Sequence, residues 1–547
     1  MTPPLPPTPP LHPLALRAGA LAAVCAASGG VSLGADPWPM LARSACRVAE
    51  AGALPAIAGA AWIASHDPAG SPVTFAGQAG VVSDGERVYA IGTVGGQART
   101  LAYDAASGTP LWSTAIPTAV LESWAAPAVD LKRGVVLAAA GFALTAIDAV
   151  SGAVRWQTPL PRPVVNASPA ITSDRDKADR ALLTLFDGYG LDGRLVCVNV
   201  DPFDSLWNPY LPGQIVWSVV LGGSSGNSPA YADGVVYVST ITTPWGGDAG
   251  QVIARRIDDP PAAPNLWTFT NPEELGFFGG VSVDDSDVAV YAASYAFAGG
   301  LESANLVKLD AASGELLWST PCNRTSSIPV PIKGGYVLLS GGLQGFGSAP
   351  SLALYKDRCT WAERVWDTAL DTWQDLNQNQ VIDPGEYLRV GGWTQVPAVA
   401  PRPDTDGTDG RTGPPFLAAI GAIPTGASTS APCTDLYVVD LSRSPAQPGF
   451  VVGAFAAAGA SPAVIGSPAS PRLFTVGAAG LHAFAACSAN CDASTTPPIL
   501  NVNDYVCFLG LFAAWDPRAN CDASTVPPVL NVNDFVCFSQ RYAEGCP

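Results

Sequence analysis

The stretch Asp104-Ala-Ala-Ser-Gly-Thr-Pro-Leu-Trp112 decides the fold, because the chain repeats its pattern twice more. The further copies are Asp148-Ala-Val-Ser-Gly-Ala-Val-Arg-Trp156 and Asp310-Ala-Ala-Ser-Gly-Glu-Leu-Leu-Trp318. In each copy the Asp side chain can accept hydrogen bonds from backbone N–H groups two or three residues on, which begins a tight turn. The Gly supplies the positive φ of a bulged hairpin, and a short strand that ends on Trp follows. A repeated unit of this kind predicts a repeat architecture of stacked sheets.

Short strand signatures accompany these turns. Segments in the style of Ser-Pro-Ala-Ile-Thr recur at residues 126–130, 168–172, 228–232 and 461–465. Together the turns and strands resemble the pyrroloquinoline-quinone-type (PQQ-like) repeat family of β-propellers, whose blades end in an Asp-Ala-x-(Thr/Ser)-Gly-x-x-x-Trp pattern. The resemblance covers residues 37–485 and implies a mainly β fold, with residues 36–485 as the propeller domain.

The number of blades follows from the closing tryptophans and from the two ends of the propeller. The blade-closing candidates are Trp112, Trp156, Trp217, Trp267, Trp318 and Trp366. A seventh unit lacks this Trp, and the last unit, which ends at 480–484, lacks its final strand. The early strand at 58–63, which contains Trp62, could complete that blade and leave no free sheet edge. We predict eight blades, with seven as the alternative.

Composition agrees with short strands joined by turns rather than with long helices. The 547 residues include 56 Gly and 51 Pro, and 14% of them are charged. The formal net charge of −18 argues against nucleic-acid binding, which needs a basic face. We expect a monomer with no transmembrane segment in the mature chain.

The first 35 residues have the features of a secretory signal peptide. A Pro-rich start is followed by Arg17 and a small-residue apolar run at 18–27, which is too short to span a bilayer. We predict a secreted protein, located outside the cell, on the cell surface or in the periplasm. The next segment, Asp36-Pro-Trp-Pro-Met-Leu-Ala-Arg43, resembles the mature N-terminus of secreted propellers of this family, which implies a strap over the disc.

An insertion at residues 361–390 contains the ligand spacing of an EF-hand calcium loop. Positions 1, 3, 5, 7, 9 and 12 of that loop are Asp375, Asn377, Asn379, the Val381 carbonyl, Asp383 and Glu386. Gln380 stands at the sixth position, where Gly normally allows the sharp turn. Residues 361–373 have helical spacing, as a helix before the loop should. We predict bound calcium that orders the insertion, with a plain acidic surface loop as the alternative.

The tail, residues 486–547, contains a direct repeat with a period of thirty residues, at 490–508 and 520–538. It resembles a dockerin of the cysteine-containing type that ends in Gly545-Cys546, and a dockerin duplicates a calcium loop followed by a helix. The resemblance implies ligands at Asn490, Asp492, Ser494, Asn501 and Asp504, and at Asn520, Asp522, Ser524, Asn531 and Asp534. Three extra residues in each loop, and fewer carboxylates, predict weaker calcium binding.

Six of the twelve cysteines lie in this tail, which predicts disulfides and an oxidising compartment. Repeat symmetry suggests the pairs Cys491–Cys507, Cys521–Cys537 and Cys487–Cys546, although fifteen pairings are open to sequence reasoning. After each loop we expect a helix with one apolar face, formed by Val506, Phe508 and Phe512 or by Val536, Phe538 and Tyr542. That face could be internal core or a surface for a partner.

The functional hypothesis favours binding over catalysis. Quinone-dependent dehydrogenases of the resembled family use a vicinal disulfide, and this chain has no Cys-Cys pair. We therefore expect no quinone and no catalytic residues, but a non-catalytic binding or scaffold protein of the cell surface or exterior. The tail would attach it, with calcium, to a protein partner, either a cohesin-like protein or a surface receptor. The alternatives are a propeller enzyme (an oxidoreductase or a hydrolase) and a purely structural protein of the envelope.

Overall fold

The computed structural model describes residues 36–544 with internal gaps at 58, 76–78, 120–124, 174, 176, 242–249, 271–275, 285, 287, 295–299, 344–346, 403–412, 425–430, 469, 486–488, 492–499, 517–518 and 522–527. The predicted signal peptide, residues 1–35, lies outside the described residues.

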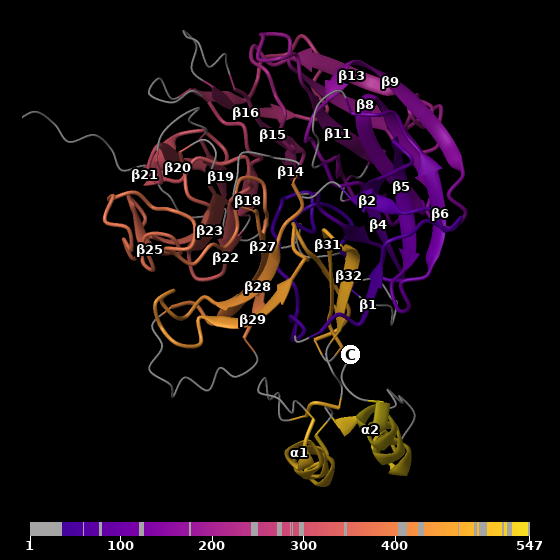
Figure 1. Ribbon diagram of the computed structural model, residues 1–547. Helices are drawn as coiled ribbons and strands as arrows, with labels where there is room; N and C mark the ends of the chain where they lie inside the picture. Colours follow the sequence, from indigo (N-terminus) through magenta and orange to yellow (C-terminus); the bar gives the residue numbers. More distant parts are fainter. Residues whose placement is uncertain are drawn as a thin grey trace, which may run out of the picture.

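The described residues form eight antiparallel sheets, which are the blades of a propeller (Figure 1). Blade one contains β2 (Val73–Phe75), β3 (Val82–Ser83), β4 (Arg87–Val94), β5 (Gln97–Asp104) and β6 (Pro110–Ala115), and blade two contains β7 (Ala128–Asp130), β8 (Val135–Asp148) and β9 (Val154–Val164). Blade three contains β10 (Ala170–Ile171), β11 (Arg180–Leu185), β12 (Arg194–Asn199) and β13 (Ile215–Val220). Blade four contains β14 (Ala230–Ala232), β15 (Val235–Ser239), β16 (Gln251–Arg256) and β17 (Trp267–Thr270).

Blades five to eight follow the same order from the innermost to the outermost strand. Blade five contains β18 (Ser282–Asp284), β19 (Ala289–Ala293), β20 (Ala304–Asp310) and β21 (Leu316–Cys322), and blade six contains β22 (Val330–Ile332), β23 (Tyr336–Gly341), β24 (Ser351–Asp357) and β25 (Ala362–Asp367). Blade seven contains β26 (Ala398–Pro401), β27 (Phe416–Ala422), β28 (Asp435–Asp440) and β29 (Val451–Ala456). Blade eight contains β30 (Ala463–Ile465), β31 (Arg472–Gly477), β32 (Gly480–Ala485) and β1 (Trp62–Ala64). In blade two, the first half of β8 pairs with β7 and its second half with β9.

The eighth blade takes its outermost strand from the other end of the propeller. β1 pairs antiparallel with β32, with Trp62 opposite Ala483 and Ile63 opposite His482. This closure confirms the predicted eight-bladed ring and rules out seven blades. The tail that follows contains two helices, α1 (Val502–Ala513) and α2 (Val532–Glu544), which Figure 1 shows apart from the disc.

The repeated turns form as their sequence predicts. In blade two, Asp148 Oδ1 accepts hydrogen bonds from Val150 N at 3.1 Å, from Ser151 N at 2.7 Å and from Ser151 Oγ at 2.8 Å. Gly152 then takes a φ of 72°. These donors, with Arg155, hold the pKa of the Asp148 carboxyl below its usual range. The turns at Asp104 and Asp310 make the same hydrogen bonds.

Five blade-closing Trp residues are bonded to the turn of the next blade, whereas the buried Nε1 of Trp366 has no hydrogen-bond partner among the described residues. Trp112 Nε1, in β6, donates to Ala149 O at 3.0 Å, and Trp267 Nε1, in β17, donates to Ala311 O at 3.0 Å. The equivalent bonds run from Trp62 to Ala105 O, from Trp217 to Ile257 O and from Trp318 to Asp357 Oδ1. The turn glycine lies against the indole ring, and a Cβ on Gly152 would be 2.7 Å from Trp112. The turn of one motif therefore contacts the Trp of the preceding blade, and the Trp of the same motif lies at the interface with the following blade.

Replacing the turn glycine should open one such interface. Gly152→Ala and Gly134→Ala both place a side chain at positive φ, a strain of about 1–2 kcal/mol. Only the Cβ at position 152 meets another residue, whereas the space at Gly134 is open within 4 Å. We expect Gly152→Ala to lower the free energy of unfolding by a further ~1–3 kcal/mol, measured by denaturant titration. Equal losses in the two variants would show that the indole contact contributes nothing.

A buried histidine lies at the ring closure. His482, in β32, is 1% exposed, and its ring meets Phe455 of blade seven edge-on at 5.8 Å. Its Nδ1 lies 3.0 Å from Gly480 O. Burial lowers the pKa of His482 below its ordinary value of 6.5, because the imidazolium would lose its hydration.

This burial predicts a pH dependence with a definite sign. The unfolded chain binds the proton more readily than the folded one, so the free energy of unfolding falls as the pH drops below about 6.5. His482→Phe should remove that part of the pH dependence, measured by denaturant titrations between neutral and mildly acidic pH. His66→Gln, at an exposed position, is the control and should keep the slope of the parent. Parallel curves for His482→Phe and the parent would contradict the assignment.

Candidate functional site

The N-terminal strap, residues 36–51, lies in the centre of the propeller. It bonds to the innermost part of each blade in turn: Trp38 to Ser83, Pro39 to Val129, Met40 to Ile171, Ala45 to Tyr231, Cys46 to Val283, Glu50 to Lys333, Ala49 to Val399, and Asp36 to Gly466. Ala42, Arg43 and Arg47 have positive φ values of 54–68°, which curl the strap tightly. The strap that was expected over the disc instead lies within it, because Trp38 and Ala49 are fully buried.

The strap carries a fully buried cation. Arg47 donates to three carbonyl oxygens, from Nε to Pro229 at 2.9 Å, from Nη1 to Leu41 at 3.0 Å and from Nη2 to Ser168 at 3.0 Å. Burial lowers the pKa of Arg47 to about 9, so the guanidinium is still charged at neutral pH. This side chain ties the strap to blades three and four.

A small pocket of about 20 Å³, room for about one water molecule, lies above the strap. It is lined by Leu41, Asn166, Gly226, Asn227, Ser228, Gly280, Ser326, Ile328, Thr394 and Val396. Except for Leu41, these residues belong to the connections that precede the innermost strands, so the pocket opens on the face formed by those connections, here called the inter-blade face. Since the strap bonds to the innermost strands themselves, it forms the floor of the pocket. The pocket is therefore reached from the inter-blade face.

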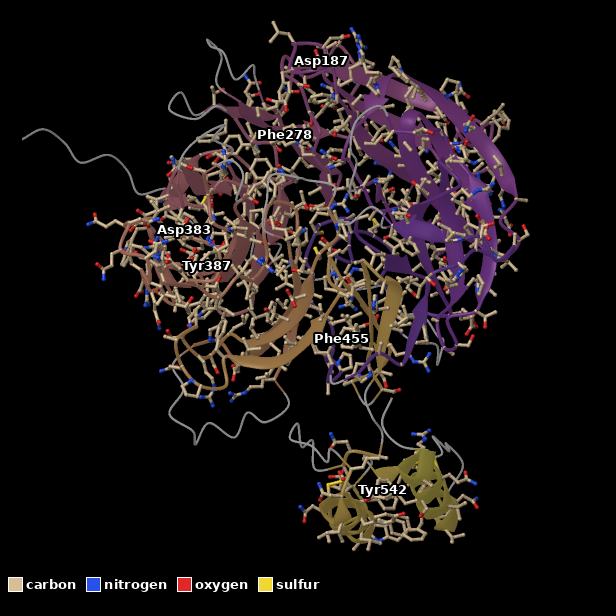
Figure 2. The ribbon with its side chains drawn as sticks, viewed as in Figure 1. Asp187, Phe278, Asp383, Tyr387, Phe455 and Tyr542 are labelled. Atoms are coloured by element: carbon tan, nitrogen blue, oxygen red, sulfur yellow. A yellow bond between two sulfur atoms is a disulfide. The ribbon has the colours of Figure 1, made fainter. Side chains whose placement is uncertain are left out.

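An aromatic cluster adjoins the pocket wall. Tyr189 stacks on Phe278 with ring centroids 6.1 Å apart, and Phe186 meets both rings edge-on. A Cβ on Gly226 would lie 3.2 Å from the Phe278 ring, so this cluster backs directly onto the pocket. Tyr189 has a φ of 71°, which is rare for a bulky residue and common at functional sites. Figure 2 shows Phe278 together with Asp187 on this part of the disc.

Sequence reasoning named none of these pocket residues. A signal was present, because Asn166 and Asn227 stand just before the Ser-Pro-Ala segments at 168–170 and 228–230. Those segments begin the innermost strands, so a polar residue immediately before them faces the mouth of the channel.

The inserted loop curls around its acidic residues. Asp383 Oδ2 accepts from Asn377 Nδ2 at 2.9 Å and from Asn379 Nδ2 at 2.7 Å. Gln380 N donates to Asp375 Oδ2 at 3.0 Å. The backbone at Gln380 has a φ of 61°, so Gln takes the left-handed conformation that Gly usually supplies at this place. The departure at the sixth position therefore does not prevent the turn.

Glu386 closes the loop. Its Oε1 accepts from Leu376 N at 3.1 Å, its Oε2 accepts from Trp373 Nε1 at 3.2 Å, and the residue is 7% exposed. The predicted ligand at loop position 7, the Val381 carbonyl, belongs to the same turn, in which Val381 N donates to Asn379 Oδ1 at 2.7 Å. Figure 2 shows Asp383 and Tyr387 near the rim of the disc.

The expected helix before this loop is wrong. Residues 362–367 form β25, the outermost strand of blade six, and turns follow to residue 372. The aromatic spacing that suggested a helix comes from Trp366, which closes its blade against Phe450 of blade seven with ring centroids 5.3 Å apart. Asp367 then fixes the start of the insertion by accepting from Ala369 N and Leu370 N, and burial raises the pKa of its carboxyl to about 6.

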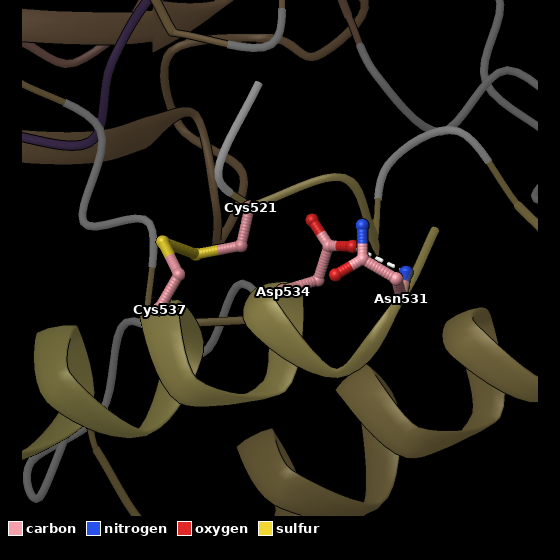
Figure 3. Close-up of a disulfide and its surroundings, with 4 residues drawn as sticks. All are labelled: Cys521, Asn531, Asp534 and Cys537. Atoms are coloured by element: carbon pink, nitrogen blue, oxygen red, sulfur yellow. Dashed lines mark hydrogen bonds between the residues drawn. A yellow bond between two sulfur atoms is a disulfide. The ribbon is translucent and has the colours of Figure 1, made fainter. Parts of the chain in front are cut away.

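In the tail, four predicted calcium ligands form two equivalent helix caps. Asn501 N donates to Asp504 Oδ2 at 2.8 Å, and Asn503 N donates to Asn501 Oδ1 at 2.9 Å. Asn531 and Asp534 repeat this arrangement at the start of α2 (Figure 3). Both aspartates are fully buried. Asp492, Ser494, Asp522 and Ser524 lie outside the described residues, and Asn490 and Asn520 precede those gaps.

The structure contains the disulfides Cys491–Cys507 and Cys521–Cys537, as repeat symmetry predicts. Each joins a loop to its helix, and Figure 3 shows the second one beside Asp534. Cys487 and Cys546 lie outside the described residues.

The two tail helices divide their apolar residues between a core and a surface. Phe508 and Phe538, which are equivalent in the repeat, stack with ring centroids 4.2 Å apart, and Tyr505 packs on Tyr542 with ring centroids 4.5 Å apart. A second set is exposed and is here called the tail stripe: Val502, Val506 and Leu509 on α1, and Val532 and Val536 on α2, with exposed fractions of 47–70%. Phe508 and Phe538 therefore belong to the internal core, whereas Val506 and Val536 are exposed.

Among the described residues, no three His, Cys, Asp or Glu side chains gather around one point in the manner of a metal site. No helix in this part of the chain has the length and apolar character needed to cross a membrane.

Comparison with known proteins supports the propeller. Residues 57–209 and 209–325 match the model of a family described as outer membrane protein assembly factor BamB, slightly less than half of the chain. No curated protein matches.

Several solved structures resemble this one at low sequence identity. A europium-containing methanol dehydrogenase has a TM-score of 0.52 and 12% identity, over 81% of this chain and 90% of that one. BamB from Moraxella catarrhalis has a TM-score of 0.42 and 15% identity, over 78% and 93%, and the Dos1 propeller has a TM-score of 0.47 and 13% identity, over 78% and 95%. These likenesses concern the fold alone.

Proposed function

We propose that this chain, a β-propeller of PQQ-like repeats, is a non-catalytic binding protein that is attached to a protein partner through its tail. The propeller contacts a ligand on the inter-blade face, because the strap fills the channel below the pocket. An oxidoreductase or a hydrolase is the alternative, and cofactor-dependent turnover or a carboxylate pair at the pocket would favour it.

The observation that carries the attachment is the tail stripe. A module with a core of stacked aromatic rings would be expected to bury its β-branched residues as well, yet Val502 and Val532 are 70% and 69% exposed. The stripe recurs on both helices at equivalent positions, so the tail presents the same apolar surface twice. Paired apolar helix faces are typical surfaces for docking a protein.

Calcium would fix the loops that hold this surface. The inserted loop offers carboxylate, amide and carbonyl oxygens, the donor types that calcium prefers, and takes positive φ at Gln378 and Gln380 as such a loop requires. In the tail, Asp504 and Asp534 are buried at the helix starts and would supply carboxylate oxygens there. An oxidising compartment, outside the cell or in the periplasm, is consistent with the two tail disulfides.

Charge on the tail stripe should abolish attachment. We expect the parent protein to recover a specific partner from the envelope fraction of its source cells by cross-linking, and Val506→Asp with Val536→Asp to lose it. Val150→Asp is the matched control, since Val150 is 67% exposed on a propeller turn. Because the stripe is duplicated, each single variant should retain part of the recovery. If the double variant recovers the same proteins as the parent, the tail does not attach the chain.

Calcium binding is tested on the full chain by calorimetry and thermal melting after chelation. We expect three ions and a higher melting temperature, since a ligand at 100 times its Kd stabilises by about 2.7 kcal/mol. Glu386→Gln should remove one ion by taking away the bidentate carboxylate, whereas Glu363→Gln, on β25, should keep all three. An unchanged number of ions in Glu386→Gln would show that the inserted loop is an ordinary acidic loop.

A further inference from the structure

One turn of the propeller is much longer than its equivalents. In blade two the turn glycine is bonded to the end of the preceding strand, from Gly152 N to Asp148 O at 2.9 Å. In blade three the same bond runs from Gly213 N to Asn199 O at 2.8 Å. Three residues separate Asp148 from Gly152, whereas thirteen separate Asn199 from Gly213. Most of residues 200–212, here called the blade-three loop, are therefore additional to the turn that the propeller needs.

The blade-three loop exposes four large apolar side chains. They are Phe203, Leu206, Trp207 and Leu211, with exposed fractions of 54–84%. The loop enters β13 at one end of the strand, and the connection to the next blade leaves from the other end. These side chains therefore lie on the face that carries the repeated turns, opposite the inter-blade face. Exposed apolar patches on soluble proteins are often interaction sites.

Hydrogen bonds within the loop hold these side chains in place. Asp204 and Asn208 exchange two backbone hydrogen bonds, each of 2.8 Å. Asp204 Oδ1 also accepts from Leu206 N at 2.8 Å and from Trp207 N at 3.1 Å. At the base of the loop, the buried Asn199 side chain donates to two loop carbonyls at 2.7 and 2.9 Å. Because the loop is already ordered, it loses little conformational entropy on binding, which suits an anchor for a partner.

The shape and charge of the loop indicate the surface that it fits. Leu206 and Trp207 are 84% and 71% exposed at a tight turn, so a surface that covers both must be concave and apolar. The loop contains two carboxylates, Asp201 and Asp204, and no Lys or Arg. Arg133 binds Asp201, whereas Asp204 is exposed, and the whole chain has a formal net charge of −18. A complementary surface is therefore basic around its apolar centre.

The position of Asp204 argues against a lipid bilayer as the surface that covers the loop. Its carboxylate accepts from the backbone N–H groups of Leu206 and Trp207, so the charge would leave water together with these side chains. A carboxylate in the apolar part of a bilayer is costly. The net charge of −18 would also be repelled by anionic lipids.

The area of the patch argues against a second copy of this chain. A large aromatic side chain offers about 150–250 Å², so the four partly exposed side chains offer roughly 500 Å² together. Two such loops packed on each other would bury less than the ~800 Å² that each partner buries in a standard interface. A Trp anchor inside a pocket needs less area, because the walls of the pocket exclude water around it.

We propose that the blade-three loop docks into an apolar pocket with a basic rim on a protein partner. Leu206 and Trp207 fill the pocket, and Asp204 faces the positive charges of the rim. This surface belongs to the propeller and depends on neither the central pocket nor the tail stripe. It adds a second contact to the proposed binding function.

The first step of the test is photo-cross-linking of the full chain, with a photoreactive phenylalanine analogue at position 206, to the envelope fraction of the source cells. We expect one protein to be cross-linked, at residues that line an apolar pocket. That protein is then purified and titrated with the full chain by calorimetry. Trp207→Ala should weaken binding about 30-fold or more, the loss typical of an interface hot spot. Trp361→Ala, at an exposed Trp in the equivalent turn of blade six, is the matched control and should bind as the parent does.

Asp204→Asn tests the basic rim. The Asn side chain keeps an oxygen for the N–H groups of Leu206 and Trp207 but removes the charge. We expect binding to weaken about two- to fivefold, as for an exposed ion pair. The salt dependence of binding should become flatter. Thermal melting checks that each variant is folded.

The proposal is overturned if nothing is cross-linked from position 206, or if Trp207→Ala or Asp204→Asn binds as tightly as the parent. Vesicles of phosphatidylcholine, with and without phosphatidylglycerol, test a bilayer, and sedimentation velocity of the parent tests self-association. Either signal, if Trp207→Ala abolishes it, would assign the loop to that surface instead. The tail variant Val506→Asp with Val536→Asp should still be cross-linked from position 206, so a failure of the tail proposal is distinguishable from a failure of this one.

Discussion

The propeller depends on one contact, the bond from an indole N–H to the turn of the next blade. Trp112 Nε1 donates to Ala149 O, and Gly152 lies against the indole ring because it has no side chain. The same motif thus supplies the turn that receives one Trp and the Trp that reaches the following blade. The same pair of interactions recurs where Trp62 and Trp267 meet the next blade, and the ring closes only when the last interface is complete.

The pairing of β1 with β32 and the strap in the centre make the ring asymmetric. β1 completes the eighth blade, and the chain then continues into blade one, so the start and end of the propeller share one sheet. The strap bonds to all eight blades and places Arg47 on the axis. One end of the channel is therefore filled by the chain itself, which leaves the inter-blade face for a ligand.

Local patterns predicted the elements well, and long-range packing explains the misses. Short segments, in which residue type and spacing decide the geometry, predicted three features correctly. These are the Asp148 turn, the closing role of Trp62 and the two tail disulfides. The helix expected at 361–373 failed because Trp366 belongs to a blade interface, which spacing alone cannot reveal. The pocket was missed because Asn227 and Ser326 lie in different connections that only the closed ring brings together.

The pairing of Trp62 with Ala483 has a consequence for how the protein is made. A chain is synthesised from its N-terminus, so β1 emerges first and its partner β32 emerges among the last parts of the propeller. During that interval β1 has no sheet to join, and the unfinished blades expose an open edge to other chains. Contacts between residues so distant in sequence form slowly. The final step of folding is therefore coupled to the completion of the chain, and this is the stage at which a holding chaperone would have most to protect.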